Sequence, residues 1–342
     1  MSTKEKSTDT SSITIQRTKL TFLGRGNWIL ETPVIQFTLA VLLFVFLILQ
    51  VPSVLRPQSL IALSLLASLL ALVSLGQTLV VILGGLDLAI PGYVVIGAYM
   101  ATTIAGAQSV PVPIALLLTA VMCGAVGVFV GYICHRFRIQ PLVVTLGVGT
   151  TLTGLALFMA GGDYSASPPD GLRDLTRLNG QTFGIPIPPL LFILVAVGVA
   201  IWLFLNKTGS GRKLYATGVN VRAAGLARVS TRKIWVSVFG FSGAVSGLAG
   251  MFIASFGAGW TQAIGEPYLF SGLAAVLVGG TTFGAVTGSF TRTILGAVIL
   301  TLLSTIIVSN GLSEAQSRIV YGLIILAVVS FYAREKRVQD RF

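Results

Sequence analysis

The sequence predicts an all-α polytopic membrane protein of about ten transmembrane helices, one or more of them broken. Of the 342 residues, 54% are hydrophobic and only 10% are charged, whereas a soluble domain carries about 25% charged residues. The mean hydropathy is +0.90, and the charges gather in a few short segments. The length suffices for about eight to twelve spans of about 20 apolar residues. These observations exclude a soluble enzyme, a disordered chain and a nucleic-acid binder.

Apolar runs and the breaks between them define the first half of the chain. Residues 1–32 are polar and basic, and we expect them to form a cytoplasmic N-terminal segment. A Gly-Gly-x-Asp-x-x-x-Pro-Gly break over 84–92 separates the second span from the third, and the basic cluster 135–138 follows the fourth. The predicted spans are 33–54, 58–83, 93–108, 114–134 and 140–160.

Charge sets the predicted orientation of the second half. Segment 161–186 holds three aspartates against two arginines, whereas 207–233 has seven basic residues and no acidic one. Because basic loops stay in the cytoplasm, we expect 207–233 and both termini inside, and 161–186 outside. The transmembrane domain then covers 33–334, and 335–342 form a cytoplasmic tail. The predicted spans are 189–205, 234–256, 268–283, 293–309 and 318–333.

Asp87 is the only acidic residue between Glu31 and Asp163. At the centre of a membrane helix a carboxylate costs about 2.5–3.5 kcal/mol, so it needs a partner or a wet cavity. Either it caps a broken helix or joins a gate, or it lies in a cytoplasmic turn and accepts backbone N–H groups at the start of the next helix. No second buried ionisable group accompanies it, which speaks against a proton relay.

Small residues recur at helical spacing inside the spans. Gly127 and Gly131 are four residues apart, as are Gly243 and Gly247. Such pairs let membrane helices approach closely, so we expect tight helix packing at both.

Catalytic signals are missing from the sequence. There is no Walker A pattern, and the single histidine and two cysteines form no metal-ligand cluster. We therefore predict no catalytic residue, no metal site and no cofactor bound by this chain, which is not expected to be an enzyme.

The basic segment 207–233 contains one predicted helix. Asn220 can accept a free N–H of a short helix over 221–227. The helix would present an apolar patch among arginines, formed by Ala223, Ala224, Leu226, Arg222 and Arg228. It is either a docking surface for a partner or a plain positive-inside loop.

Four motifs, in order along residues 35–335, resemble those of the ribose/pentose-type sugar ABC-transporter permeases. The early motif is Gly76-Gln77-Thr78-Leu79-Val80 with Gly84-Gly85-Leu86-Asp87-Leu88. The second is Ile139-Gln140-Pro141 with Thr145-Leu146-Gly147. The third is Gly211-Arg212-x-x-Tyr215-Ala216-x-Gly218-x-Asn220-x-x-Ala223-Ala224-x-Leu226. The last is Ala275-Val276-x-x-Gly279-Gly280-Thr281-Thr282-Phe283. The chain departs from the family pattern at Pro91, Arg228, Ala285, Val286 and Arg292.

The resemblance implies import powered by another subunit. A separate ATPase would hydrolyse ATP-Mg and contact 212–228, with Ala223 and Ala224 facing it. A second permease chain, identical or different, would complete the pathway in the bilayer of a bacterial inner membrane. A soluble sugar-binding protein would deliver a monosaccharide or related small polyol. Candidate coupling residues are Arg212, Tyr215, Gly218, Asn220, Ala223, Ala224 and Leu226.

Two Gly-Gly motifs are the candidate gate or broken-helix elements. Their residues are Gln77, Gly84, Gly85, Asp87, Gly279, Gly280 and Thr281. The alternative function is a secondary, ion-coupled transporter of a small polar solute, which would be expected to show inverted repeats and intramembrane ion-coupling groups.

Overall fold

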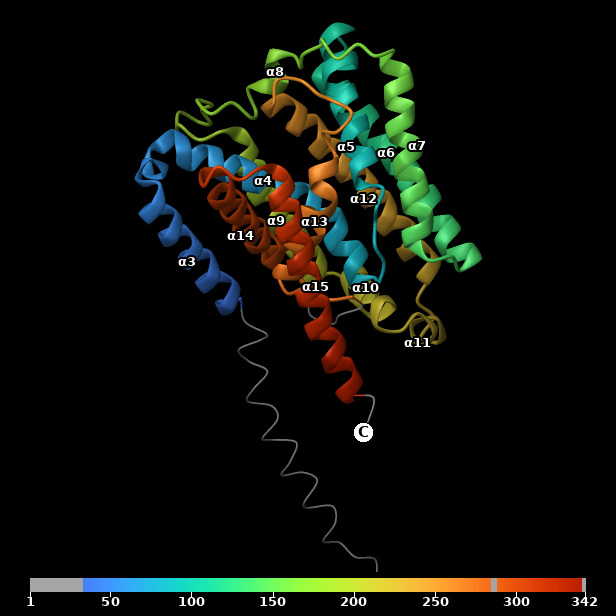
Figure 1. Ribbon diagram of the computed structural model, residues 1–342. Helices are drawn as coiled ribbons and strands as arrows, with labels where there is room; N and C mark the ends of the chain where they lie inside the picture. Colours follow the sequence, from blue (N-terminus) through green and yellow to red (C-terminus); the bar gives the residue numbers. More distant parts are fainter. Residues whose placement is uncertain (1–32, 284–287, 340–342) are drawn as a thin grey trace, which may run out of the picture.

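The predicted all-α class is confirmed (Figure 1). The computed structural model describes residues 33–283 and 288–339. Within these ranges the chain forms helices and loops, with one isolated backbone bridge between Thr182 and Ile185. The segment 1–32 and the end of the tail lie outside the described residues.

Each of the ten predicted spans coincides with a helical segment. In the first half these are α3 (Val34–Gln50), α4 (Pro57–Ile82), α5 (Ile90–Tyr99) continued by the π-helix η2 (Met100–Ala107), α6 (Val112–Phe137) and α7 (Pro141–Ala160), with the short η1 (Pro52–Leu55) after α3. In the second half they are α9 (Pro189–Lys207), α12 (Thr231–Phe256), α13 (Glu266–Val278), α14 (Phe290–Ser309) and α15 (Glu314–Gln339). The short helices α8 (Asp170–Arg173), α10 (Gly209–Val219) and α11 (Val221–Leu226) lie between them.

Seven helical segments of the described chain are long and apolar enough to cross a membrane. The apolar parts of α3, α13 and α15 are shorter. With 13 residues, α13 is about 20 Å long at 1.5 Å per residue, less than the hydrocarbon thickness of about 30 Å. The prediction of a full span over 268–283 is therefore wrong, and α13 is one of the broken elements that the fold class anticipated.

Helix α12 is the centre of the bundle and packs against α4, α5 and α6 (Figure 1). The expected close packing at small residues is confirmed on this helix. A Cβ atom added to Gly243 would lie 2.3 Å from the Cys123 carbonyl oxygen, and one added to Gly127 would lie 2.1 Å from that of Phe239. Backbones meet here without intervening side chains, as in other small-residue membrane contacts. Helices α6, α7 and α9 lie outside this centre and expose large apolar side chains.

Both Gly-Gly motifs end a helix in the same way. At the end of α4, Gly84 N–H donates to Val81 and Gly85 N–H to Val80. At the end of α13, Gly280 N–H donates to Leu277 and Thr281 N–H to Val276. This pair of bonds is the Schellman motif, with Gly84 at φ +90° and Gly280 at φ +84°. The helix end at Val278, rather than at 283, follows from this glycine.

The first break is shorter than predicted. Helix α5 begins at Ile90, so Pro91 and Gly92 belong to its first turn and not to the break. Proline is tolerated there because the N–H groups of the first turn have no intrahelical acceptor. A residue without an N–H therefore loses no hydrogen bond at this position.

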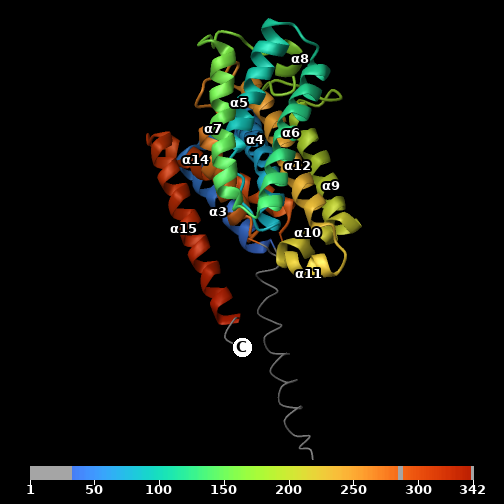
Figure 2. The same cartoon turned by 90° about the vertical axis from the view of Figure 1, so that its right-hand side faces the viewer.

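The two oppositely charged segments lie at opposite ends of the bundle (Figures 1 and 2). Helix α8, in the segment predicted to be external, is at one end, and α10 and α11 are at the other. The start of α3 and the end of α15 lie toward the α10–α11 end. The relative arrangement of the loops therefore agrees with the charge-based topology.

Candidate functional site

The capped helix predicted after Asn220 is present as α11. The Asn220 Oδ1 atom accepts the Ala223 N–H at 2.9 Å. Leu226 is 88% exposed, but Ala224 is buried. The expectation that both alanines face a partner is therefore wrong for Ala224, because its face of the short helix packs against the rest of the chain.

Helix α10 was not anticipated from the sequence. It begins at the Thr208 cap, whose Oγ1 accepts the Gly211 N–H at 3.1 Å, and it buries Leu214 and Thr217. Its three glycines and polar composition do not predict a helix from the sequence. The capping threonine alone indicates where the helix begins. One residue, Asn220, separates α10 from α11.

Two candidate coupling residues of α10 face inward, and a third does not. Tyr215 Oη donates to the Gly288 carbonyl. A Cβ atom on Gly218 would lie 2.0 Å from the Ile82 carbonyl oxygen, so α10 rests on the backbone at the end of α4. Arg212 is exposed.

Asp87 anchors the first break and is 1% exposed. Its Oδ2 accepts the Ser242 hydroxyl of α12 at 2.7 Å, and its Oδ1 accepts the Ala89 N–H at 3.0 Å. The Asp87 N–H donates to Gln77 Oε1 at 3.3 Å. Asp87 thus accepts a backbone N–H at the start of α5, as the turn interpretation expected, but it lies in the protein interior.

The same break is tied to a second helix. The Leu88 N–H donates to the Thr145 hydroxyl of α7 at 3.0 Å. The early motif and the Thr145 motif, which the sequence offered as separate resemblances, are therefore parts of one polar junction.

The second break is held by a hydroxyl group. Thr281 is completely buried, and its Oγ1 accepts the Ser289 N–H at 3.3 Å. A Cβ atom on Gly279 would lie 2.6 Å from the Arg292 carbonyl oxygen, which brings α13 and α14 together. Ala285 and Val286 lie outside the described residues.

The second break touches the end of α4 that leads into the first break, although about 200 residues separate them in the sequence. A Cβ atom on Gly288 would lie 2.6 Å from Ile82 Cγ1 and 2.7 Å from Thr281 Cγ2. Nearby, the buried hydroxyl groups of Thr78 and Thr293 are 2.9 Å apart. No sequence pattern pointed to this contact.

The structure shows the surroundings of Arg228 and Arg292, two positions at which the chain departs from the family pattern. Arg228 ends α11 at φ +59°, in the left-handed region that favours glycine. Arg292 lies near Tyr215, whose pKa is raised by burial and lowered to a lesser extent by the Arg292 charge. The Tyr215 phenol therefore keeps its proton and remains a donor to Gly288.

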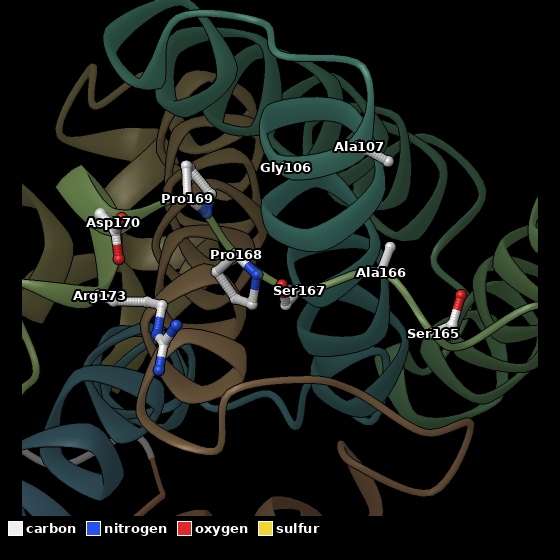
Figure 3. Close-up of a pocket in the computed structure, with 9 residues that line it drawn as sticks. All are labelled: Gly106, Ala107, Ser165, Ala166, Ser167, Pro168, Pro169, Asp170 and Arg173. Atoms are coloured by element: carbon white, nitrogen blue, oxygen red, sulfur yellow. The ribbon is translucent and has the colours of Figure 1, made fainter.

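A pocket of about 410 Å³ lies at the α8 end of the bundle (Figure 3). It is formed by the end of η2 and the loop that leads into α8, with Asp170 and Arg173 at its rim. Asp170 is also ion-paired with Arg177 at 2.8 Å. The residues that line the pocket are Gly106, Ala107, Ser165, Ala166, Ser167, Pro168, Pro169, Asp170 and Arg173.

Comparison with known families identifies the class of protein. The family model described as branched-chain amino acid transport system / permease component matches residues 59–329. The chain belongs to this family. The permease is similar to the ribose import permease protein RbsC of Bacillus subtilis (28% identity over 81% of the chain and 85% of the relative). It is also similar to RbsC of Escherichia coli K12 (28% identity; 76% and 80%) and to the autoinducer 2 import system permease protein LsrC of Yersinia enterocolitica (29% identity; 80% and 75%).

These relatives confirm the resemblance to ribose/pentose-type sugar ABC permeases. The permease is accordingly a membrane subunit of the sugar ABC importer class, which the family favours over an ion-coupled secondary transporter. No solved structure matches the permease significantly.

Proposed function

We propose that the permease moves a monosaccharide or related small polyol across a bacterial inner membrane, with energy from ATP-Mg hydrolysed on a separate ATPase subunit. The names of the relatives, which refer to import of ribose and autoinducer 2, support this substrate class. Uptake of radiolabelled sugars, polyols and amino acids by proteoliposomes that contain the complete importer tests it. Uptake of amino acids alone would contradict it.

The ATPase contact is proposed at α11. The observation that carries the proposal is an apolar surface on a polar segment: Val219, Val221 and Leu226 are all exposed, and Leu226 is 88% exposed. Arg222 and Arg228 lie in the same segment and are exposed. Exposed apolar side chains together with arginines are a composition typical of protein–protein interfaces.

The Leu226→Glu variant tests this contact. A carboxylate placed in a desolvated interface without a partner is costly. We expect normal insertion, reduced co-purification of the ATPase, and loss of substrate-stimulated ATP hydrolysis. Phe183→Glu, at a 96% exposed site of the opposite end, is the matched control and should retain the ATPase. Normal co-purification with Leu226→Glu would remove α11 as the contact.

We propose that the α8 end faces outward and receives a soluble binding protein, while α10 and α11 lie in the cytoplasm. The charge asymmetry and the pocket beside Arg173 support this orientation. In intact cells an impermeant maleimide should label Ser165→Cys and spare Ser210→Cys. Added binding protein should protect the first site. Labelling of Ser210→Cys from outside would overturn the topology.

A second permease chain is proposed to pack on α7. The exposed face of α7 carries Gly147, Thr150, Thr151 and Gly154 among its large apolar side chains, whereas the exposed residues of α9 between Phe192 and Phe204 include no glycine and no hydroxyl side chain. Small and hydroxylated residues are typical of membrane helix interfaces. Oxidation of Thr151→Cys should cross-link two permease chains, and Val199→Cys is the control. Cross-linking of Val199→Cys but not Thr151→Cys would place the partner on another face.

A further inference from the structure

The two Gly-Gly breaks and the cytoplasmic segment meet at one junction. Tyr215 and Gly218 are three residues apart on α10, so they share one face of that helix. Tyr215 is bonded to Gly288 of the second break, and Gly218 lies on Ile82 immediately before the first. One face of an 11-residue helix therefore contacts the second break and the end of α4 that leads into the first.

We propose that α10 transmits the movement of α11 to both breaks through these two contacts, Tyr215 to the second and Gly218 to the first. The inference rests on the proposed docking of the ATPase at α11. Tyr215 and Gly218 are positioning residues, because each acts through the backbone it touches.

The contact at Gly218 is rigid. The α-carbon of Gly218 faces the Ile82 carbonyl with no room for a methyl group, and both Ile82 and Leu83 are buried. Close-packed interiors transmit displacement because they have little free volume. A shift of α10 toward α4 must therefore move the end of α4, and Gly84 follows two residues later.

The contact at Tyr215 is directional. The hydroxyl of Tyr215 donates to the carbonyl of Gly288, a residue whose α-carbon lies against the side chains of Ile82 and Thr281. Removal of the hydroxyl leaves the ring in place but frees the Gly288 carbonyl from α10. The two contacts can thus be broken separately, one by adding a methyl group and the other by removing an oxygen.

The test uses the permease purified with its ATPase subunit and two reporter cysteines, Leu86→Cys in the first break and Thr282→Cys in the second. The rate of maleimide modification is measured without nucleotide and after trapping with ATP and vanadate. In the otherwise unchanged permease, we expect trapping to change the rate at both reporters.

The two variants should give a crossed pattern. Gly218→Ala should abolish the change at Leu86→Cys, and Tyr215→Phe should abolish the change at Thr282→Cys. Gly209→Ala, whose added methyl group would meet only the tip of Arg212 at 3.9 Å, and Tyr164→Phe at the α8 end should leave both changes intact. If Gly218→Ala does not fold, Tyr215→Phe alone must still abolish the change at Thr282→Cys and leave the change at Leu86→Cys intact.

The outcomes distinguish this inference from the proposed function. Failure of the ATPase to bind the unchanged permease through α11 removes the proposed docking site on which this inference rests. With binding intact, three results overturn the inference. The modification rates of the reporters do not change on trapping, or Gly218→Ala and Tyr215→Phe leave both changes intact, or Tyr215→Phe abolishes the change at both reporters equally.

Discussion

The two breaks of the permease have the same backbone ending but different anchors. Gly84 and Gly280 complete equivalent Schellman motifs. Beyond them, the first break buries the carboxylate of Asp87 against Ser242, whereas the second relies on the hydroxyl of Thr281 and on Tyr215. The backbone motif decides where a helix ends, and the side chains beyond it decide how firmly the break is held to the bundle.

The largest effect is expected for the anchor of the first break. Asp87→Ala leaves the Ser242 hydroxyl and the Ala89 N–H without their acceptor. Each unsatisfied buried donor costs about 1–3 kcal/mol, so we expect the free energy of unfolding to fall by about 3 kcal/mol in a denaturant titration. Asp163→Ala removes an exposed acceptor of the Ser165 N–H and should cost much less. Equal losses would contradict the difference between a buried and an exposed anchor.

Alanine at the two helix ends should reveal their equivalence. Gly84→Ala and Gly280→Ala each force a side chain into the left-handed region, at about 1–2 kcal/mol per residue. We expect similar decreases in stability in the same titration. Gly322→Ala, a helical glycine with no atom within 4 Å of the added carbon, is the control and should not lower stability. A large loss at only one of the two ends would show that the motifs are not equivalent.

The anchor of the second break should be weaker. Thr281→Val keeps the methyl group beside Gly288 but leaves the Ser289 N–H without its acceptor, which should cost about 1 kcal/mol. Thr305→Val is the matched control, because the Thr305 hydroxyl bonds only to the Thr301 carbonyl of its own helix. A loss as large as that of Asp87→Ala would make the two anchors equal and remove the contrast.

A third helix end gives the smallest expected effect, with the opposite sign. Helix α11 ends in the same pair of bonds, from Arg228 to Gly225 and from Val229 to Ala224, but without glycine. Arg228→Gly relieves the left-handed strain and adds some chain entropy, for a net gain of about 0.5 kcal/mol. Arg222→Gly, inside α11, should instead lower the thermal midpoint. A lower midpoint for Arg228→Gly would show that its arginine makes a stabilising contact.

The sequence predicted the parts of the fold that depend on local composition. Apolar runs located all ten helical segments, because burial in lipid requires a continuous apolar stretch. Asn220 was identified as a cap because its partner, Ala223, is three residues away. The span 268–283 was drawn too long because Gly279 and Gly280 are small and apolar, so hydropathy does not register the turn that they make.

The contacts between distant segments could not be predicted. Ser242 lies 155 residues from Asp87, and no residue pattern around either one indicates that they are in contact. Helix α10 was missed because it is stabilised by packing on Ile82 and Gly288 rather than by its own apolar stripe. Ala224 was placed on the wrong face because a six-residue helix has too few turns to fix its orientation from sequence.

The central position of α12 has a consequence for biogenesis. The helices that surround it, α4 to α6, are synthesised more than ninety residues earlier. Until α12 enters the bilayer, the Asp87 carboxylate has no hydroxyl donor from Ser242, and the glycine-lined faces of the earlier helices have no partner. The packing of α4 to α6 is therefore complete only after α12 has been synthesised. The first half of the permease is not expected to assemble as an independent unit before the second half is made.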